Sequence, residues 1–464
     1  MSPSINVEDL PLNRFHKRLA VYSAGGPFLD GYVLSIIGIA LVQAAPQLEL
    51  TLYWEGLIGA SALVGIFIGG FLGGWLTDKF GRQTLYTLDL AAIVLCSALQ
   101  FWVQEAIWLF VLRLLIGIAV GADYPIATSL LVEFTPRKYR GPLVGGLIVM
   151  WFVGAAAAYI VGELLLQAGP DGWRWMLASA TLPAVVFLIL RHGTPESPRW
   201  LANKGRLKEA KAVVAKVFGE GVRLESFGAV PGEHVNASVL FRSGYGGRIF
   251  FISVFWTCSI IPLFAIYAFA PRILDALGLG ASMANVGSAF ITILFLLGTL
   301  VFVLLINRLG RRKVILHSFL WSGLALLGLG HFPQSSPIVT MILFAAYALL
   351  IGGTQILQWV YPNELFPTEI RGTAVGLASS LSRIGAAAGT YLVPLSLTEL
   401  GIGPTMLIAA GVTLVGFLVS LRMAPETRGL GLHEASSCRE GDPRTRLEKV
   451  AISGERCRLF PHES

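Results

Sequence analysis

The sequence predicts an all-α membrane protein of twelve transmembrane helices, from its composition, the length of its apolar segments and an internal repeat. Of its 464 residues, 55% are hydrophobic and only 14% are charged, whereas soluble domains average about 25% charged residues. So few charges cannot cover a water-soluble protein of this size without leaving large apolar patches exposed. A lipid bilayer removes that difficulty.

Apolar segments long enough to cross a bilayer recur along the whole chain. About 20 helical residues span a hydrocarbon core of about 30 Å. Segments of this length indicate helices, because the strands of a membrane barrel alternate over only about ten residues. The predicted spans are 18–43, 57–77, 84–103, 107–133, 142–167, 174–192, 248–270, 286–306, 313–332, 338–361, 373–395 and 402–422.

The charges of the connecting loops predict the orientation. Basic residues occupy the loops after the second, fourth, eighth and tenth spans: Lys79, Arg82, Arg137, Lys138, Arg140, Arg308, Arg311, Arg312, Lys313 and Arg371. The alternate loops carry mainly acidic residues, with Arg174 and Arg272 as exceptions. Because positively charged loops stay in the cytoplasm, we expect both termini and the long central loop to be cytoplasmic.

The spans and polar segments predict four regions. They are an N-terminal six-helix half (1–192), a cytoplasmic central loop (193–247), a C-terminal six-helix half (248–422) and a cytoplasmic tail (423–464). Within the central loop, the pattern from Asn203 to Phe218 predicts a short amphipathic helix that lies at the membrane surface.

Three motifs of the first half return in the second half at nearly one spacing. Asp78 to Arg82 returns as Asn307 to Arg311, Glu133 to Pro136 as Glu364 to Pro367, and Pro195 to Ser197 as Pro425 to Thr427, at offsets of 229, 231 and 230 residues (307 − 78, 364 − 133, 425 − 195). Three pairs at one spacing indicate two six-helix halves that cross the membrane in the same direction. Parallel repeats of this kind rock about a midplane site between them.

Several of these motifs are similar to those of a known family. The segment 69–81, GGFLGGWLTDKFG, followed by Arg82, resembles the loop signature of the major facilitator superfamily, and Arg113 with Gly117 and Gly121 resembles its fourth-helix pattern. PESPRW at 195–200 and PETRG at 425–429 resemble the sugar-porter branch. The resemblance covers residues 20–430. It implies a secondary transporter that moves a small molecule by alternating access, and one chain already contains both halves of a functional monomer.

The fixed spacing of these cytoplasmic motifs predicts a latch, that is, a set of contacts that holds the two halves together at the cytoplasmic end. The candidate gating residues are Asp78, Gly81, Arg82, Glu133, Arg140, Arg311, Glu364 and Arg371. Asp78 can accept hydrogen bonds from a helix N-terminus. The pairs that we expect are those of Arg82, Arg140 and Arg371 with Glu133 and Glu364. Such pairs would hold the two halves together on one face and break when that face opens. The alternative is that these charges only orient the helices in the membrane.

Ionisable residues at membrane depth are candidates for proton coupling. Each costs a few kcal/mol to insert and is a functional candidate by default. Asp30 in the first span and Asp123 in the fourth are the expected proton-coupling acids, with Arg113 as their partner. Separation from the arginine would let an acid take up a proton and so change the preferred conformation. The alternative is a buried Asp30–Arg113 pair that only fixes helix packing, and Asp89 in the third span could likewise serve packing.

The residues around these acids carry a second resemblance. Asp30-Gly-Tyr32 and Gly121-Ala-Asp123-Tyr124-Pro125 look like the proton-phosphate symporters and their organic-acid relatives. In that group the matching acids are linked to protons and the residue matching Tyr124 to the anion. Arg383 stands where the phosphate group carries a lysine, Gln355 near a polar ligand of the tenth span, and Trp256 also matches. An acid and an aromatic hydroxyl of that group are replaced here by Ile260 and Phe264, which weakens the case for phosphate.

Aromatic residues around one cation suit a small carboxylate, because binding sites usually have apolar walls and few polar anchors. The expected lining is Tyr124, Trp151, Trp256, Phe264, Tyr267, Trp359 and Arg383. We therefore predict proton-coupled symport of a small organic anion, aromatic carboxylates included. A sugar or sugar-acid symporter, a phosphate symporter and a membrane sensor without transport remain as alternatives.

Other classes of function find little support in the sequence. It shows no nucleotide-binding loop, nucleophile–base pair or metal-ligand spacing, so we expect neither an enzyme nor a nucleotide-driven pump, and no cofactor or metal. The basic residues lie in short loops rather than along one face, which argues against nucleic-acid binding.

Overall fold

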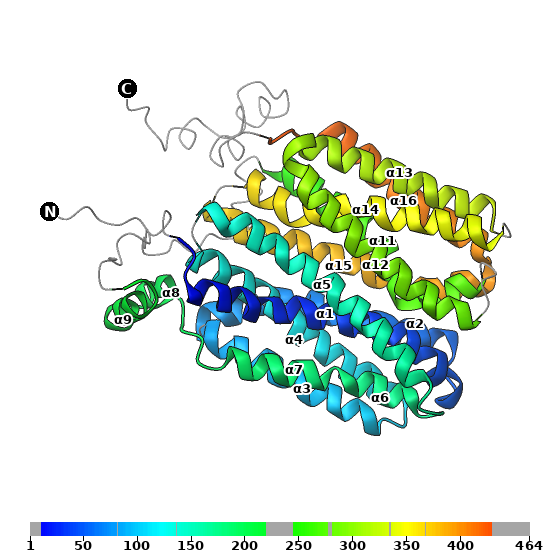
Figure 1. Ribbon diagram of the computed structural model, residues 1–464, viewed down its shortest axis with the longest axis horizontal. Coiled ribbons are helices and arrows are strands. Elements are labelled where there is room, and N and C mark those ends of the chain that lie inside the picture. Colours follow the sequence, from blue (N-terminus) through cyan, green and yellow to red (C-terminus); the bar gives the residue numbers. More distant parts are fainter. Residues whose placement is uncertain are drawn as a thin grey trace.

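The computed structural model describes residues 11–80, 82–135, 137–219, 245–276, 281–333, 336–366 and 368–428. Over these ranges the regular secondary structure is helical, and the long helices run roughly along one common direction (Figure 1). Ten segments of this part of the chain are long and apolar enough to cross a membrane. The chain is therefore a helical multi-pass membrane protein, and this prediction is confirmed.

The helices before the central loop form what we call the N-terminal half, and those after it the C-terminal half. The N-terminal half contains α1 (Arg14–Gln47), α2 (Leu52–Phe80), α3 (Arg82–Leu99), the 3-10 turn η2 (Gln100–Trp102), α4 (Ala106–Phe134), α5 (Arg137–Leu166), α6 (Gly172–Ser179) and α7 (Thr181–Arg191). The C-terminal half contains α11 (Gly246–Leu274), α12 (Ala281–Leu309), α13 (Arg311–His331), α14 (Pro337–Leu365), α15 (Thr368–Glu399) and α16 (Ile402–Met423).

Three predicted spans differ from a simple apolar helix. The sixth span is divided into α6 and α7 because Pro183 has no N–H to donate to the carbonyl of Ser179. In α12 the apolar segment among the described residues is only Phe290–Ile306. Helix α15 has 32 residues, enough to cross, but it buries Ser382 and Arg383 inside the bundle. Its low apolarity therefore reflects an interior position.

The two halves repeat the same helix packing. In the first half α1 packs on α5, α2 on α4 and α3 on α7, and in the second half α11 packs on α15, α12 on α14 and α13 on α16. Between the halves, α2 packs on α15, α5 on α12 and α1 on α11. The repeat of sequence motifs is thus matched by a repeat of packing.

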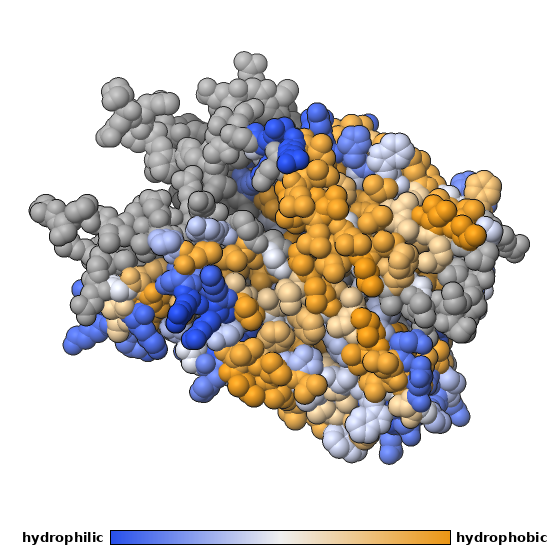
Figure 2. Space-filling view, in the orientation of Figure 1, coloured by the Kyte–Doolittle hydropathy of each residue, from blue (hydrophilic) through white to orange (hydrophobic). Residues whose placement is uncertain are grey.

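The flank of the helical body is apolar. Figure 2 shows hydrophobic side chains across the middle of the visible face and hydrophilic ones gathered toward its ends. Large exposed hydrophobic side chains include Leu164, Leu182, Ile189, Leu304 and Ile338. Exposed apolar surface on this scale marks the face that meets lipid.

The predicted amphipathic helix of the central loop begins at Leu207 rather than Asn203, and it packs against the helical body. Two helices occupy the segment, α8 (Pro198–Asn203) and α9 (Leu207–Phe218). They are separated at Gly205, whose φ of +75° favours glycine. The apolar face of α9 packs on protein rather than on lipid: the ring of Phe218 lies 6.3 Å from that of Phe134 at the end of α4. Asn13, the N-cap of α1, donates to the carbonyl of Val217 over 2.9 Å.

A close crossing of α1 and α5 supports the interior and can be tested. A Cβ on Gly154 would lie 1.9 Å from the carbonyl oxygen of Phe28, whereas one on Gly146 of the same helix would meet nothing within 4 Å. We expect Gly154→Ala to push α5 from α1 and lower the melting temperature in detergent, by an overpacking cost of about 1–3 kcal/mol. Gly146→Ala should leave it equal or slightly higher. Equal melting temperatures for both variants would contradict the close crossing.

Candidate functional site

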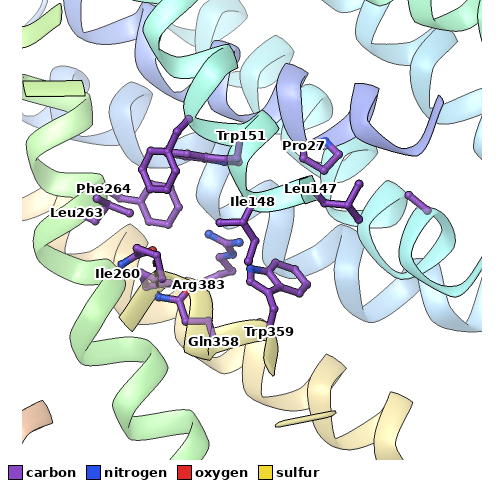
Figure 3. Close-up of a pocket in the computed structure, with 13 residues that line it drawn as sticks. Pro27, Leu147, Ile148, Trp151, Ile260, Leu263, Phe264, Gln358, Trp359 and Arg383 are labelled. Carbon is purple, nitrogen blue, oxygen red and sulfur yellow. Dashed lines mark hydrogen bonds between the residues drawn. The ribbon is translucent and has the colours of Figure 1, made fainter. Parts of the chain in front are cut away.

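A cavity lies between the two halves at mid-helix depth. It encloses about 620 Å³ of empty space, part of it continuous with solvent. Figure 3 shows Pro27, Leu147, Ile148 and Trp151 on one side and residues of the C-terminal half on the other. The lining residues are Pro27, Ala127, Leu147, Ile148, Trp151, Phe152, Ile260, Leu263, Phe264, Gln355, Gln358, Trp359 and Arg383. Because both halves form its walls, a relative movement of the halves must change its shape.

The polar groups of the cavity come from α14 and α15. Arg383 lies midway along α15 and is 4% exposed. Its guanidinium carbon stands 5.0 Å from the ring centre of Phe264. Gln358 donates to the hydroxyl of Ser259 over 2.5 Å and to the amide oxygen of Gln355 over 3.2 Å. The site thus offers one cation and two amides within an otherwise apolar wall, and both Arg383 and Gln355 lie where the sequence placed a ligand.

Aromatic rings form much of the remaining wall, but one predicted ligand is not part of it. The rings of Trp151 and Phe264 meet edge to face at 5.8 Å across the two halves. Trp256 is fully buried and packs at 5.5 Å against Trp359. Its prediction as a substrate ligand needs correction, because Trp359 lines the cavity and Trp256 does not. The side chains of Tyr124 and Tyr267 lie outside the described residues.

Asp30 joins the cavity wall through one hydrogen bond. The indole N–H of Trp151 donates to Oδ2 of Asp30 over 2.7 Å, and Asp30 is fully buried. Ring contacts continue from Trp151 to Phe264 and from there to Arg383. A buried acid in α1 is therefore linked through two aromatic side chains to the cation in α15.

Arg113 does not pair with either predicted acid. Within the described part of the chain, its guanidinium donates to the carbonyl oxygens of Ile58 at 3.3 Å and Val33 at 3.4 Å. Ten residues separate Arg113 from Asp123, which is about 15 Å along a helix. The guanidinium reaches toward α1 and α2 instead, and this corrects both the predicted coupling pair and the alternative structural pair with Asp30.

The partner of Asp123 is Arg191, which the sequence analysis missed. Nη1 of Arg191 lies 2.6 Å from Oδ1 of Asp123 and Nη2 lies 3.0 Å from Oδ2, a bidentate pair. Asp89 of α3 is also near, with Oδ2 3.7 Å from Nη1 of Arg191. The available signal was a basic residue in the last turn of the sixth span.

The repeated motifs form matching helix caps. Glu426 accepts from the backbone N–H groups of Arg311 and Arg312 at 2.9 and 3.2 Å, where α13 begins. Glu196 of the earlier copy accepts from the backbone N–H of Gln83 at 3.0 Å, where α3 begins. Carboxylates stabilise helix N-termini by meeting unpaired N–H groups and the helix dipole. The described caps therefore use the glutamate of the PES and PET motifs.

The described ion pair of the predicted latch lies within one half. Nη2 of Arg311 lies 2.8 Å from Oε1 of Glu364, and Thr427 donates to the other oxygen of that carboxylate over 2.5 Å. These contacts join α13, α14 and the segment after α16, so this pair lies within the C-terminal half and does not bridge the two halves. Gly81 and the side chains of Asp78, Arg82, Glu133, Arg140 and Arg371 lie outside the described residues.

An ion pair at the opposite end of the bundle does join the halves. Glu55 near the start of α2 binds Arg272 near the end of α11. Beside it, the rings of Tyr53 and Tyr391 meet edge to face at 6.1 Å. One turn deeper, a Cβ on Gly59 would lie 3.1 Å from the ring of Phe269. This end, which the loop charges predict to be extracellular, is therefore tightly closed.

The backbone of α11 is kinked at that closed end. Phe269 has non-helical dihedral angles (φ −134°, ψ 21°) within α11. Pro271 follows two residues later and cannot donate to the carbonyl of Tyr267. The kink separates the last turns of α11, which carry Arg272, from the part that lines the cavity.

No metal centre accompanies this site in the described ranges, where no three His, Cys, Asp or Glu side chains are grouped to hold an ion. The described side chains are suited to binding and to proton exchange. Arg383, Gln355 and Gln358 line the cavity, and buried acids lie behind the wall formed by the N-terminal half.

Comparison with protein families gives one match over most of the chain. The family model described as "Sugar (and other) transporter" matches residues 19–438. Two relatives from Escherichia coli carry metabolite-transport names: YaaU is 44% identical over 94% of this chain and 98% of its own, and YgcS is 42% identical over 93% and 96%. The arabinose-proton symporter of Bacillus subtilis is 26% identical over 92% and 96% of the two chains.

Solved structures have the same fold. The xylose transporter XylE from E. coli, in a partially occluded inward-open conformation, matches with a TM-score of 0.78 at 20% identity. The match covers 90% of this chain and 100% of that one.

The closed end gives a second testable prediction. Removing the Glu55–Arg272 pair with Glu55→Gln should favour opening at that end. A partly exposed ion pair contributes about 1 kcal/mol, so the open population should rise roughly fivefold. The measurement is the labelling rate of a cysteine placed at the buried Thr390 by a membrane-impermeant maleimide, with the four native cysteines replaced.

The charge-swapped double variant Glu55→Arg with Arg272→Glu serves as the control, because it restores an ion pair between the same helices. Its labelling rate should return toward that of the parent. If Glu55→Gln labels no faster than the parent, the ion pair does not hold this end closed.

Proposed function

This chain belongs to the sugar (and other) transporter family of the major facilitator superfamily, and we propose that it is a symporter that carries a sugar acid together with a proton. The observation that supports this most directly is a buried arginine in the cavity wall, next to two amides. Arg383 meets a carboxylate through two parallel hydrogen bonds, a geometry that lysine cannot provide.

The amides and rings suit the rest of such a substrate. Gln355 and Gln358 each present groups that donate and accept, which hydroxyl groups require. The flat rings of Trp151 and Trp359 present apolar faces to the C–H groups of a sugar ring. The relatives named for arabinose and glucose transport are consistent with a carbohydrate ligand. A sugar acid combines these requirements with the cation.

Proton coupling follows from the charge of the substrate. A monoanion that enters alone moves against a membrane potential that is negative inside, at about 2.3 kcal/mol per 100 mV. Entry with one proton is electrically neutral and can be driven by a pH gradient. Asp30 is the proposed carrier nearest to the substrate, because Trp151 connects it to the cavity wall. Protonation of Asp30 would remove the charge that accepts from this indole.

In the proposed cycle, residues 1–192 and 248–422 move as two units, with both termini and the central loop in the cytoplasm. The basic loops support this orientation. Contacts within each unit, such as Arg311–Glu364, keep it rigid, while Glu55–Arg272 forms and breaks between the units. The proposed gating residues of the cytoplasmic motifs act at the other end of the same movement.

An aromatic carboxylate is the second candidate. The observation that favours it is the large share of aromatic side chains in the wall: Trp151, Phe152, Phe264 and Trp359. The two candidates separate on competition for the purified protein. A hexuronate should compete for the site better than benzoate if the amides read hydroxyl groups, and benzoate should compete better if the rings dominate.

The first prediction of this proposal concerns Arg383. Arg383→Gln should weaken the binding of a hexuronate by about 2 kcal/mol or more, roughly thirtyfold, because it removes one partner of a buried charge pair. The corresponding neutral hexose should lose much less. Ligand-dependent thermal shifts of the detergent-purified protein measure both. Gln358→Leu is the matched control and should weaken both ligands alike. Equal losses for acid and hexose in Arg383→Gln would remove the anion from the proposal.

The second prediction concerns Asp30. Asp30→Asn imitates the protonated acid permanently, so transport should no longer respond to a pH gradient. In proteoliposomes, labelled substrate should fail to accumulate when the outside is acidic, while exchange of internal for external substrate continues. A variant that still concentrates substrate would show that the coupling proton binds elsewhere. Binding without exchange in the parent protein would favour the sensor alternative.

A further inference from the structure

Three charged side chains form a dry cluster behind α1. Asp89 comes from α3, Asp123 from α4 and Arg191 from α7. The side chain of Arg191 is fully buried, and each carboxyl side chain is 3% exposed. The cluster holds two acids and one base. If both acids are ionised, it carries a net negative charge in the interior of a membrane protein.

The guanidinium of Arg191 makes its hydrogen bonds to groups other than Asp89. It makes the bidentate pair with Asp123 and donates to the carbonyls of Tyr22 at 3.1 Å and Tyr86 at 3.4 Å. Its guanidinium carbon also stacks 3.7 Å from the ring centre of Tyr86. Asp89 is left with the longer contact of 3.7 Å, which is too long for a hydrogen bond.

Asp89 is satisfied at one oxygen only. Oδ1 accepts from the backbone N–H of Leu90 over 2.6 Å. Oδ2 is buried and has no hydrogen-bond donor among the described residues. The carboxylates of Asp89 and Asp123 both face Nη1 of Arg191, at 3.7 and 2.6 Å. The other groups that face the cluster are the hydroxyl of Tyr86 and, from α1, the hydroxyl of Ser23, and these bond to each other at 3.3 Å. In the part of the chain that the structure describes, the ion pairs of both carboxylates are with Arg191.

A single proton resolves this arrangement. Two carboxylates that face one guanidinium in a desolvated site repel each other, and a proton between them removes that repulsion. A proton on Oδ2 of Asp89 neutralises the surplus charge and turns that oxygen into a donor toward Asp123. We propose that Asp89 and Asp123 share one proton beside Arg191, and that this carboxyl pair is a proton-binding site of the transporter in addition to Asp30.

The cluster lies where a movement of α1 would affect it and the cavity together. Gly26 of α1 covers it so closely that a Cβ there would lie 1.4 Å from Oδ2 of Asp123. The next residue, Pro27, lines the cavity. A shift of α1 against α4 therefore changes the cavity wall and the cover of the acids together. When water reaches Asp89, the O–H bond can break and the proton leaves to solvent. The role in coupling rests on the proposed symport, but the shared proton does not.

Infrared spectroscopy of the full-length purified protein tests the shared proton without transport. The wild-type spectrum at neutral pH should contain the carbonyl stretch of a protonated buried carboxylic acid, and the Asp89→Asn spectrum should lack that contribution. Asp123→Asn should lack it too, because Asp89 then becomes the sole acid facing Arg191 and ionises. Asp171→Asn is the matched control, since it removes an exposed acid and should keep the band.

A wild-type minus Asp89→Asn difference spectrum without this band overturns the proposal. Asp89→Asn is expected to fold, because the amide has the shape and donor of the protonated acid. If Asp123→Asn does not fold, the Asp89→Asn spectrum decides alone.

Proteoliposomes test the coupling role. Asp89→Asn should lose accumulation driven by a pH gradient and keep substrate exchange, whereas Asp171→Asn should keep both. Accumulation by Asp89→Asn equal to that of wild type overturns the carrier role. A wild-type protein that accumulates no substrate under a proton gradient instead contradicts the proposed symport, and the infrared result for Asp89 still stands on its own.

Discussion

The buried guanidinium of Arg191 organises the polar interior of the N-terminal half. From the end of α7 it binds a carboxylate of α4, backbone carbonyls of α1 and α3, and the face of Tyr86. A charge in this position is tolerable only because paired and hydrogen-bonded partners replace water. Four helices are thereby fixed around one side chain. The cavity wall formed by α1 and the positions of Asp89 and Asp123 both depend on it.

The two halves contribute different chemistry to one site. The N-terminal half supplies buried acids, Asp30 among them, and the C-terminal half supplies Arg383 with its neighbouring amides. Trp151 connects the two sets, because its indole N–H binds Asp30 and its ring packs against Phe264. The guanidinium of Arg383 lies over the other ring, that of Phe264. In the proposed symport, the proton and the anion would bind on opposite sides of this aromatic contact and would influence each other without touching. That division is the physical basis of the proposed coupling.

The repeated motifs and the contacts between halves do different work. Glu196 and Glu426 cap equivalent helices, and Arg311 with Glu364 ties the last helices of one half together. These contacts can persist when the halves move, because each lies within a rigid unit. The contact between halves at the closed end depends instead on Glu55, Arg272 and close packing at glycines, all near the kink of α11. These contacts between the halves lie beside the kink of α11.

The class of fold could be predicted from the sequence, because long apolar segments, basic loops and motifs repeated at one spacing follow from local composition and order. Arg383 stood out as a charge within an apolar span, Gln355 followed from the family resemblance, and both line the cavity. The partners of the buried charges emerged from the packing of the helices: Arg113 reaches backbone carbonyls, Asp123 meets Arg191, and Trp256 packs against Trp359. The reason is geometric. A helix fixes which residues share its face, but the partner of a buried charge depends on the rotation and depth of a neighbouring helix, and no local pattern in the sequence records either.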